Sequence, residues 1–297
     1  MAPSSWRLGS QRTLALEPYA LMAIVNVTPD SFSDGGAFPS AAAAASAAFG
    51  LVAEGAAILD IGGESTRPGA DRIDAAEQIR RVVPVIDAIR RLSDVPISID
   101  TTLAAVAEAA LAAGADAVND VSAAEEDEGM LPLVARRRCG IVLMHRVLPP
   151  DRDRYSTELS GLAAPPIGGD IVDAVRERLL ACADRALRAG IDRDAIALDP
   201  GLGFGKTVEQ NWALVARSGE LADLGFPLLV GASRKSFIGR ASGVDDPAKR
   251  VVGSAMAAAI AWSGGARILR VHDVAATREA LGVAMAAARQ SLGPSNC

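Results

Sequence analysis

Aromatic residues are scarce in this chain. Phe, Trp and Tyr together make up 4% of the 297 residues, whereas half of the residues are hydrophobic. The core must therefore consist mainly of Ala, Val, Leu and Ile, as is typical of the inner layers of barrels built from eight parallel strands. The length is close to the roughly 250 residues of such barrels, which favours one domain.

Cysteine and histidine are also rare. Cys139, Cys182 and Cys297 are widely spaced and form no Cys-x-x-Cys pair, and the only histidines are His145 and His272. This spacing excludes the usual zinc and haem motifs, so we expect oxygen ligands for any metal. We interpret the cysteines as two small hydrophobic residues and a terminal thiol.

An excess of positive charge and a long apolar run are both missing. The net charge is −6 and the pI is near 5.1, which argues against a nonspecific nucleic-acid surface. The basic run 136–138 ends a predicted helix, where cations complement the helix dipole. Because no apolar stretch reaches about 18 residues and residues 1–12 contain no apolar signal core, we expect a cytoplasmic protein without membrane or nucleic-acid partners.

Eight short apolar runs alternate with eight helix patterns. The predicted strands are residues 21–27, 57–61, 96–99, 117–119, 140–144, 196–198, 227–230 and 268–271. The predicted helices are 40–54, 74–92, 104–113, 129–138, 170–189, 208–223, 246–263 and 275–291. Apolar runs without alternation indicate strands buried on both faces. The pattern predicts an α/β fold, a (β/α)8 TIM barrel over residues 20–291, with 1–19 as an arm or short hairpin capping its bottom and 292–297 as a tail.

Glycines and prolines mark the connections. Gly55, Gly114, Gly190 and Gly264 follow predicted helices and fit left-handed C-caps. Residues 146–169 contain four prolines and form an unusually long connection. A mobile loop and an ordered lid both fit that segment.

Polar residues follow the predicted strands. They are Asn26, Asp60 through Arg67, Asp100, Asn119 with Asp120, His145, Asp199, Ser233 through Lys235, and Arg270 with His272. In an eight-stranded parallel barrel, the carboxyl ends of all strands meet at one rim, where the chemistry of this fold takes place. These side chains are therefore expected to belong to one site.

Five segments carry the most distinctive patterns: NVTPDSFSDGG at 26–36, GGESTRPG at 62–69, DPGLGFGK at 199–206, GASRKSF at 231–237 and RVHD at 270–273. In order and spacing they resemble the dihydropteroate synthases of folate biosynthesis over nearly the whole chain. The resemblance implies a transferase that condenses 6-hydroxymethyl-7,8-dihydropterin diphosphate with 4-aminobenzoate, giving 7,8-dihydropteroate and pyrophosphate.

The pterin ring presents adjacent donors, which a carboxylate can accept in pairs. Asp199 has this role by resemblance, Asn119 can donate and accept, and Asp100 can accept a further proton. Lys235 should reach the pterin carbonyl or a ring nitrogen. The resemblance also assigns Thr66, Met144 and Gly231 to the pterin diphosphate site. Taken singly, Asp199 and Asn119 also fit a turn and a helix cap.

The leaving group requires cations. Arg67, Arg270 and His272 follow the second and eighth predicted strands, which we expect to be neighbours in the closed barrel. By resemblance they bind the diphosphate, and Asn26 is a ligand of a Mg²⁺ ion that bridges its oxygens. Surface ion pairing is the alternative interpretation of the two arginines.

For 4-aminobenzoate, the resemblance implies a ring site of Phe32, Pro68 and Phe204. Either phenylalanine also fits an ordinary core position. The serine-rich start of a short helix offers N–H groups and the Ser236 hydroxyl to the carboxylate.

The expected reaction is displacement at the pterin methylene. Catalysis is assigned to Lys235, Arg270 and His272, with Asp34 contacting the developing cation or the metal. We expect residues 28–38 and 64–72 to be mobile until diphosphate and Mg²⁺ order them, so that the pterin binds first. The family is generally dimeric through its outer helices, which implies a homodimer.

Two other functions remain open. Methyltransferases that use a methyltetrahydrofolate share this barrel, but their substrate has no diphosphate. A noncatalytic relative is the other, because the family's usual Met-His-x-x-Gly-x-Pro stretch departs here to MHRVLPP at 144–150. Two nucleotide motifs are rejected: Pro200 interrupts a phosphate loop before Lys206, and the pair Gly62 and Gly63 lacks the third glycine of a dinucleotide fingerprint.

Overall fold

The structure, a computed structural model, describes residues 3–10, 12–27, 41–160 and 167–291. Its centre is an eight-stranded parallel sheet with the order β8-β7-β6-β5-β4-β3-β10-β9. The strands are β3 (Ala20–Asn26), β4 (Ile58–Gly62), β5 (Ile97–Asp100), β6 (Ala117–Asp120), β7 (Gly140–Met144), β8 (Ile196–Asp199), β9 (Leu229–Val230) and β10 (Ile268–Val271). A bridge between Leu198 and Leu228 joins the two ends of the sheet, so the predicted barrel is confirmed.

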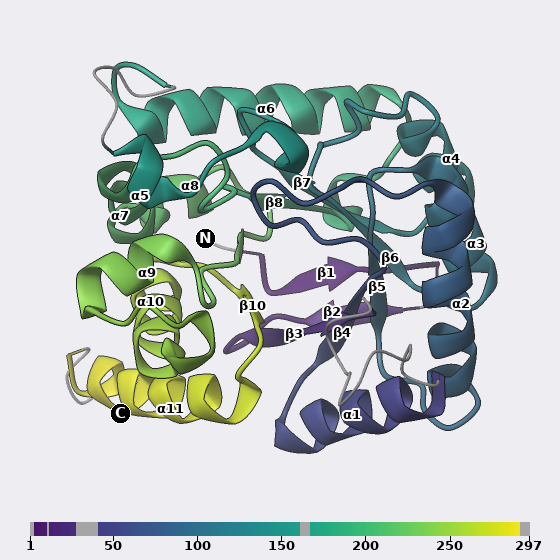
Figure 1. Cartoon of the computed structure of the whole chain (residues 1–297), viewed down its shortest axis with the longest axis horizontal. Helices are drawn as coiled ribbons and strands as arrows, with labels where there is room; N and C mark the ends of the chain where they lie inside the picture. Colours follow the sequence, from purple (N-terminus) through teal and green to yellow (C-terminus); the bar gives the residue numbers. More distant parts are fainter. Residues whose placement is uncertain (1–2, 11, 28–40, 161–166, 292–297) are drawn as a thin grey trace, which may run out of the picture.

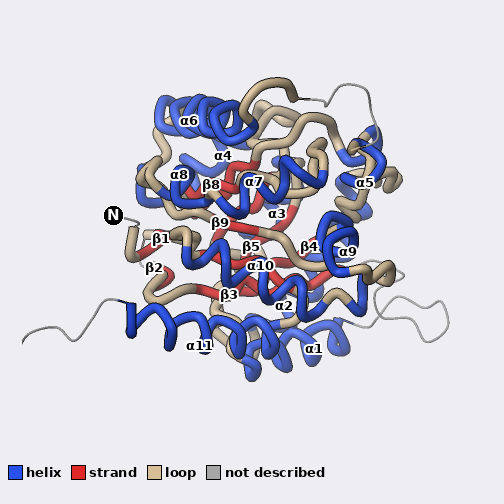
Figure 2. Tube along the Cα trace, turned by 90° about the vertical axis from the view of Figure 1, so that its left-hand side faces the viewer, coloured by secondary structure: helices blue, strands red, loops and turns tan. Residues whose placement is uncertain are grey.

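Helices cover the outside of the strands (Figures 1 and 2). They are α1 (Ala41–Glu54), α2 (Ala75–Arg90), α3 (Ala104–Ala112), α4 (Met130–Arg137), α6 (Ile171–Arg188), α7 (Val208–Ala216), α8 (Ser218–Ala222), α10 (Val251–Ser263) and α11 (Val274–Ser291). Side chains start several of them: Asp74 caps α2, Asp170 caps α6, and Thr207 forms a capping box with Gln210 at α7. Among the described residues, none of the helices is long and apolar enough to span a membrane.

The amino-terminal segment forms a hairpin, which is one of the two predicted alternatives. Strands β1 (Ser5–Arg7) and β2 (Thr13–Ala15) pair antiparallel and pack against the first residues of the barrel strands. Trp6 is fully buried there, and its Nε1 donates to the Ala195 carbonyl at 2.8 Å. The apolar layer at this end consists of Trp6, Leu8, Leu14, Leu16, Ala20, Met22, Ile58, Ala117, Val142, Ala197, Leu229 and Ile268. The hairpin therefore closes the barrel at the end opposite the polar rim.

Three local predictions were wrong. The helix predicted over 208–223 is two helices, because the backbone of Arg217 leaves the helical region between α7 and α8. The helix predicted from 246 begins at Val251, after the 3-10 turn η3 (Pro247–Lys249). Gly264 is not left-handed (φ −81°), and Gly265 takes that conformation with φ +105°, whereas Gly55, Gly114 and Gly190 have the predicted positive φ.

The long connection after β7 contains ordered turns. It includes the 3-10 turn η1 (Pro150–Arg152) and the short helix α5 (Ser156–Leu159). Asn211 donates to the Ser156 hydroxyl, and Gly205 donates its N–H to Asp153, so the described part of this segment packs on the loop after β8 and on α7. Residues 161–166 lie outside the described chain.

Strand register places the polar strand ends side by side. Asn26 is opposite Gly62, Gly62 is opposite Asp100, and Asp100 is opposite Asn119. On the other side of the barrel, Met144 is opposite Asp199. Because all eight strands are parallel, these residues share the carboxyl-terminal rim, as predicted.

Candidate active site

The centre of the rim is an ion cluster around Arg270 on β10. Its Nε donates to Asp60 Oδ2 and its Nη2 donates to Asp100 Oδ2, each at 2.6 Å. Asp60 is fully buried on β4, and it also accepts from the Ser98 hydroxyl at 2.6 Å and from Asn119 Nδ2 at 3.0 Å. Asp60 therefore holds both the guanidinium of Arg270 and the amide of Asn119.

Burial dominates the electrostatics of this cluster. It raises the pKa of Asp100 to about 7, even though the charge of Arg270 acts in the opposite direction. Burial alone would lower the pKa of Arg270, but Asp60 and Asp100 outweigh it and raise that pKa. Asp100 Oδ1 is buried and has no hydrogen-bond partner among the described residues. The cluster thus contains one oxygen able to accept from a ligand.

A second group lies at the end of β8. Asp199 Oδ1 accepts from the Gly201 N–H at 2.7 Å, and burial raises the Asp199 pKa. Lys235 Nζ donates to the Leu202 carbonyl at 2.6 Å and lies 4.1 Å from the ring centre of Phe204, which packs with Met144. A carboxylate and an ammonium group thus lie beside an apolar wall.

Lys206 holds the loop after β8, which carries Phe204 of this group. It is fully buried, and its Nζ donates to the carbonyls of Gly201 at 2.7 Å, Phe204 at 3.0 Å and His145 at 3.3 Å. A side chain at Gly201 would place its Cβ 1.8 Å from the His145 carbonyl oxygen, and φ there is +64°, so the close approach requires glycine. Burial lowers the pKa of Lys206 to about 7.

His272 follows β10 and is oriented by Ser233. The Ser233 hydroxyl accepts from the His272 backbone N–H at 3.2 Å and lies 3.0 Å from the ring Nδ1. Burial, together with the charges of Arg234 and Arg270, lowers the pKa of His272 to about 3. The ring is therefore neutral near pH 7.

The remaining predicted residues lie at other strand ends, in the rim loops or outside the described residues. Asn26 ends β3, Ser236 begins α9 (Ser236–Ser242), and Gly231 follows β9. The loop after β4 contains Thr66 and Pro68, both half-buried, and the exposed Arg67. Phe32, Asp34 and the rest of the predicted loop 28–38 lie outside the described residues.

One geometric prediction was wrong. The second and eighth barrel strands, β4 and β10, are not neighbours, since β3 lies between them and pairs with both. Arg270 nevertheless reaches Asp60 on β4, because both side chains lie at the rim.

Sequence reasoning placed Asp60 among the polar strand ends of the site but gave it no contact, and it assigned no role to Ser98 or Lys206. A signal was present for Asp60, a single carboxylate inside the apolar run of β4. Lys206 appeared only as the last residue of the DPGLGFGK segment and in a rejected nucleotide motif. Its contacts with three carbonyls depend on how the loop after β8 folds back on β7.

The barrel and its charged rim define an enzyme of the (β/α)8 class with a site for a small polar ligand. Residues 22–272 match the family described as pterin binding enzyme. The chain is 46% identical over 264 residues to the dihydropteroate synthase of Synechocystis sp., which covers 89% of this chain and 88% of that protein. The chain therefore belongs to the pterin-binding enzyme family.

Solved structures agree with this placement. The Xanthomonas albilineans dihydropteroate synthase with 4-aminobenzoic acid has a TM-score of 0.86 and 43% identity, covering 96% of this chain and 98% of that one. A structure of the enzyme from the same organism with 7,8-dihydropteroate has a TM-score of 0.82 and 40% identity, covering 95% and 98%. The fold and the solved relatives thus agree with membership of the pterin-binding enzyme family.

Proposed function

We propose that this chain is a dihydropteroate synthase, which joins 6-hydroxymethyl-7,8-dihydropterin diphosphate to 4-aminobenzoate with release of pyrophosphate. The observation that carries the proposal is the convergence of Asp199, Asn119, Lys235, Arg270 and His272 on one rim of a barrel in this family. The carboxylate and amide suit the donor-rich pterin edge, and the cationic groups suit a phosphorylated leaving group.

In this mechanism the C–O bond at the pterin methylene breaks and the neutral aniline nitrogen forms the new C–N bond. The resulting ammonium group loses its proton to water or to phosphate. No strong base is needed, so catalysis depends on positioning and on neutralising the leaving group. Lys235 holds the pterin ring, and Arg67 and Arg270 face the diphosphate.

His272 acts in this scheme as a neutral donor. The Ser233 hydroxyl accepts from the His272 backbone and can donate its own hydrogen to Nδ1. That arrangement leaves the ring proton on Nε2, where it can bind a phosphate oxygen. The low pKa of His272 supports this neutral form.

A Mg²⁺ ion fits the same rim. A Cβ placed on Gly62 would lie 3.8 Å from both Asn26 Oδ1 and Asp100 Oδ2, so an amide oxygen and a carboxylate oxygen both lie near this strand end. Oxygen ligands suit Mg²⁺, which keeps several waters and binds substrate phosphates. Asn26 would hold the ion, with Asp100 beside it, and the bound ion would supply positive charge to the leaving group.

Pyrophosphate release from the two purified substrates tests the function. The wild-type chain should release pyrophosphate and form dihydropteroate, and Lys235→Ala should lower turnover on the order of 100-fold by removing one preorganised charge contact. Lys249→Ala, which changes a lysine 78% exposed, is the matched control and should leave the rate unchanged. A wild-type chain that binds the pterin diphosphate without turnover would instead identify a noncatalytic relative. No specific observation favours the methyltransferase alternative.

For the assembly we propose a homodimer through α10 and α11. Val252 and Met256 on α10 are 81% and 57% exposed, and Val283 on α11 is 69% exposed, which is unusual for apolar residues on helices that pack together. Light scattering should give a dimer mass for the wild type and a monomer mass for Met256→Glu. Leu92→Glu changes an exposed leucine beyond α2 and should remain dimeric. A monomeric wild type at micromolar concentration rejects this assembly.

We also propose that the enzyme works in the cytoplasm. Cys139 and Cys182 are free thiols in the structure, and burial raises the pKa of both. Unpaired cysteines are usual in a reducing compartment. Cell fractionation followed by immunoblotting would test the location.

A further inference from the structure

The rim carries an ion network that the proposed mechanism does not use. It consists of Arg72, Thr102, Glu126 and Arg146, which we call the rim network. Arg72 binds Glu126 in a bidentate manner, with Nη1 to Oε1 at 2.9 Å and Nη2 to Oε2 at 2.6 Å. The Thr102 hydroxyl donates to Glu126 Oε2 at 2.6 Å, and Arg146 Nη2 donates to Glu126 Oε1. One carboxylate thus joins two arginines and a hydroxyl.

These residues come from different loops of the rim. Arg72 lies in the loop after β4, which also contains Thr66, Arg67 and Pro68, the predicted substrate residues. Glu126 lies in the loop after β6, and Arg146 lies in the loop after β7. A backbone hydrogen bond of 2.8 Å from Gly69 to the Pro150 carbonyl also ties the β4 loop to the β7 loop.

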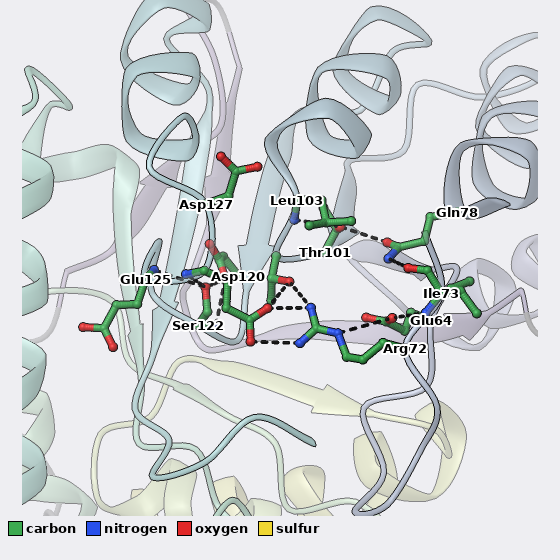
Figure 3. A network of polar contacts seen from close by, with 12 residues as sticks. Glu64, Arg72, Ile73, Gln78, Thr101, Leu103, Asp120, Ser122, Glu125 and Asp127 are labelled. Carbon is green, nitrogen blue, oxygen red and sulfur yellow. Dashed lines mark hydrogen bonds and ion pairs between the residues drawn. The ribbon is translucent and has the colours of Figure 1, made fainter. Parts of the chain in front are cut away.

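The base of the β4 loop is held as well (Figure 3). Glu64 accepts from the Ile73 N–H at 2.8 Å and lies 3.7 Å from Arg72 Nε. Gln78 donates to the Ile73 carbonyl at 3.3 Å and accepts from the Thr101 hydroxyl at 3.0 Å. The two ends of the loop are therefore joined at Glu64 and Arg72, with Thr66–Pro68 between them.

Glu126 is itself placed by a strained turn. Ala123 and Ala124 both have positive φ, 53° and 60°, a conformation that alanine rarely adopts. The buried Asp120 stabilises the turn by accepting from the N–H groups of Ser122 at 2.7 Å and Ala124 at 2.9 Å. Such strain persists only where the surrounding contacts determine the conformation, and it is common at functional sites.

The network is charged under ordinary conditions. Burial alone would raise the pKa of Glu126, but the hydrogen bonds from Arg72, Thr102 and Arg146 outweigh it and lower that pKa to about 2. Arg146 is mostly buried and lies in the segment 144–150 that departs from the usual family pattern. It therefore anchors that segment to the same carboxylate as the β4 loop.

We propose that Glu126 is a positioning residue for substrate binding: by holding Arg72 and Arg146 it keeps the Thr66–Pro68 segment in place over the rim. This inference rests on the proposed function for its kinetic consequence. Without the anchor, the β4 loop must be ordered by the substrates themselves, and part of their binding energy is lost. On this inference, the β4 loop of the wild type is held in place before the substrates bind. The prediction of a loop ordered only by ligands then applies to a variant that lacks the Glu126 anchor.

The preceding residue, Glu125, offers a matched control. Glu125 also contacts two arginines, Arg178 and Arg185, but these lie on the outer helix α6. Glu126→Gln should raise KM for the pterin diphosphate and for 4-aminobenzoate about 10-fold, with kcat within about 3-fold, since a positioning contact affects binding more than the chemical step. Glu125→Gln should leave both KM values equal to those of the wild type. Equal KM values in wild type and Glu126→Gln would overturn the proposal.

Limited trypsin digestion tests the same inference without substrates. The Arg72–Ile73 bond lies beside the network, and mass spectrometry of the fragment 1–72 reports its cleavage. Glu126→Gln should be cut there about 10-fold faster than the wild type or Glu125→Gln. Equal rates would reject the anchor even if the enzyme is active, whereas faster cleavage with no pyrophosphate release from the wild type would reject the proposed function alone.

Arg146→Met removes one arm of the network and leaves the Arg72 pair. It should raise both KM values by less than Glu126→Gln does. In the double variant Glu126→Gln with Arg146→Met, the fold-increase in each KM should be smaller than the product of the two single-variant increases. Multiplicative effects would show that Arg146 acts independently of Glu126. If Glu126→Gln does not fold, the KM values and the digestion rate of Arg146→Met decide the outcome.

Discussion

Arg270 and Asp60 stand 210 positions apart in the sequence, yet the Arg270 Nε donates a hydrogen bond of 2.6 Å to Asp60 Oδ2. Asp60 is fully buried, and the same guanidinium also binds Asp100. Arg270 therefore has a second role beside the proposed contact with diphosphate, because it compensates two buried carboxylates. A variant at this position affects stability and catalysis together.

Arg270→Ala should lower the free energy of unfolding by about 3–5 kcal/mol, since it leaves buried carboxylates unpaired. Turnover should fall on the order of 100-fold. Urea unfolding and pyrophosphate release measure the two effects. The double variant Asp60→Asn with Arg270→Ala should regain part of the stability but none of the activity. Unchanged stability in Arg270→Ala would contradict this account of the cluster.

The alkaline limb of activity should report Lys235. Burial lowers its pKa to about 8, against the opposing charge of Asp199. The ammonium is charged below that value and neutral above it, so kcat/KM, which follows the free enzyme, should fall above about pH 8. A pH profile of Lys235→Arg should show this limb moved to higher pH, because arginine stays protonated. An alkaline limb identical in both enzymes would assign it to another group.

Glu126 should contribute to stability in a pH-dependent manner. Its pKa falls from an ordinary 4.5 to about 2 in the folded chain, so its contribution is present above pH 4.5 and is lost as the pH falls toward 2. The stability difference between wild type and Glu126→Gln should therefore be smaller at pH 3 than at pH 6. Urea unfolding at the two pH values measures it, and a constant difference would argue against the charged network.

The β1–β2 hairpin, which closes the end of the barrel opposite the rim, should stabilise the fold without affecting catalysis. Trp6→Ala removes a fully buried indole and its hydrogen bond to Ala195, and should cost about 3–5 kcal/mol. The KM values should stay within about 2-fold of the wild type, because the hairpin lies at the end of the barrel opposite the rim. Thermal unfolding and steady-state kinetics check both. A raised KM would mean that the bottom layer and the rim are coupled.

Much of the fold was predictable from local patterns. The apolar runs that became β3 to β10 are buried on both faces in a parallel barrel, and their polar ends lie at one rim. The interruption at Arg217 was missed, although the polar run over 217–220 with Gly219 gave a signal for it. In the structure the Ser218 hydroxyl donates to the Ala261 carbonyl on α10. At the end of α10, the left-handed conformation predicted for Gly264 is found one residue later, at Gly265. A shift of one residue depends on local backbone geometry.

The candidate site could also be predicted only in part. Asp100, Asn119, Asp199, Lys235 and Arg270 were all expected at the rim, and the structure places them there. Their partners were not expected: Asp60 for Arg270 and Asn119, and the carbonyl of Leu202 for Lys235. The rim network around Glu126 was also absent from sequence reasoning, since nothing in the spacing of two arginines and a glutamate relates one to another.

The sequence by itself determined which segments become strands and helices, and which end of the barrel carries the polar residues. That follows from the period of the apolar pattern and from the single direction of parallel strands. Only the tertiary structure decided which cation meets which carboxylate, as at Arg270 and Asp60 or at Arg72 and Glu126. These pairs form between loops and strands that barrel closure brings together, and closure is a property of the whole chain.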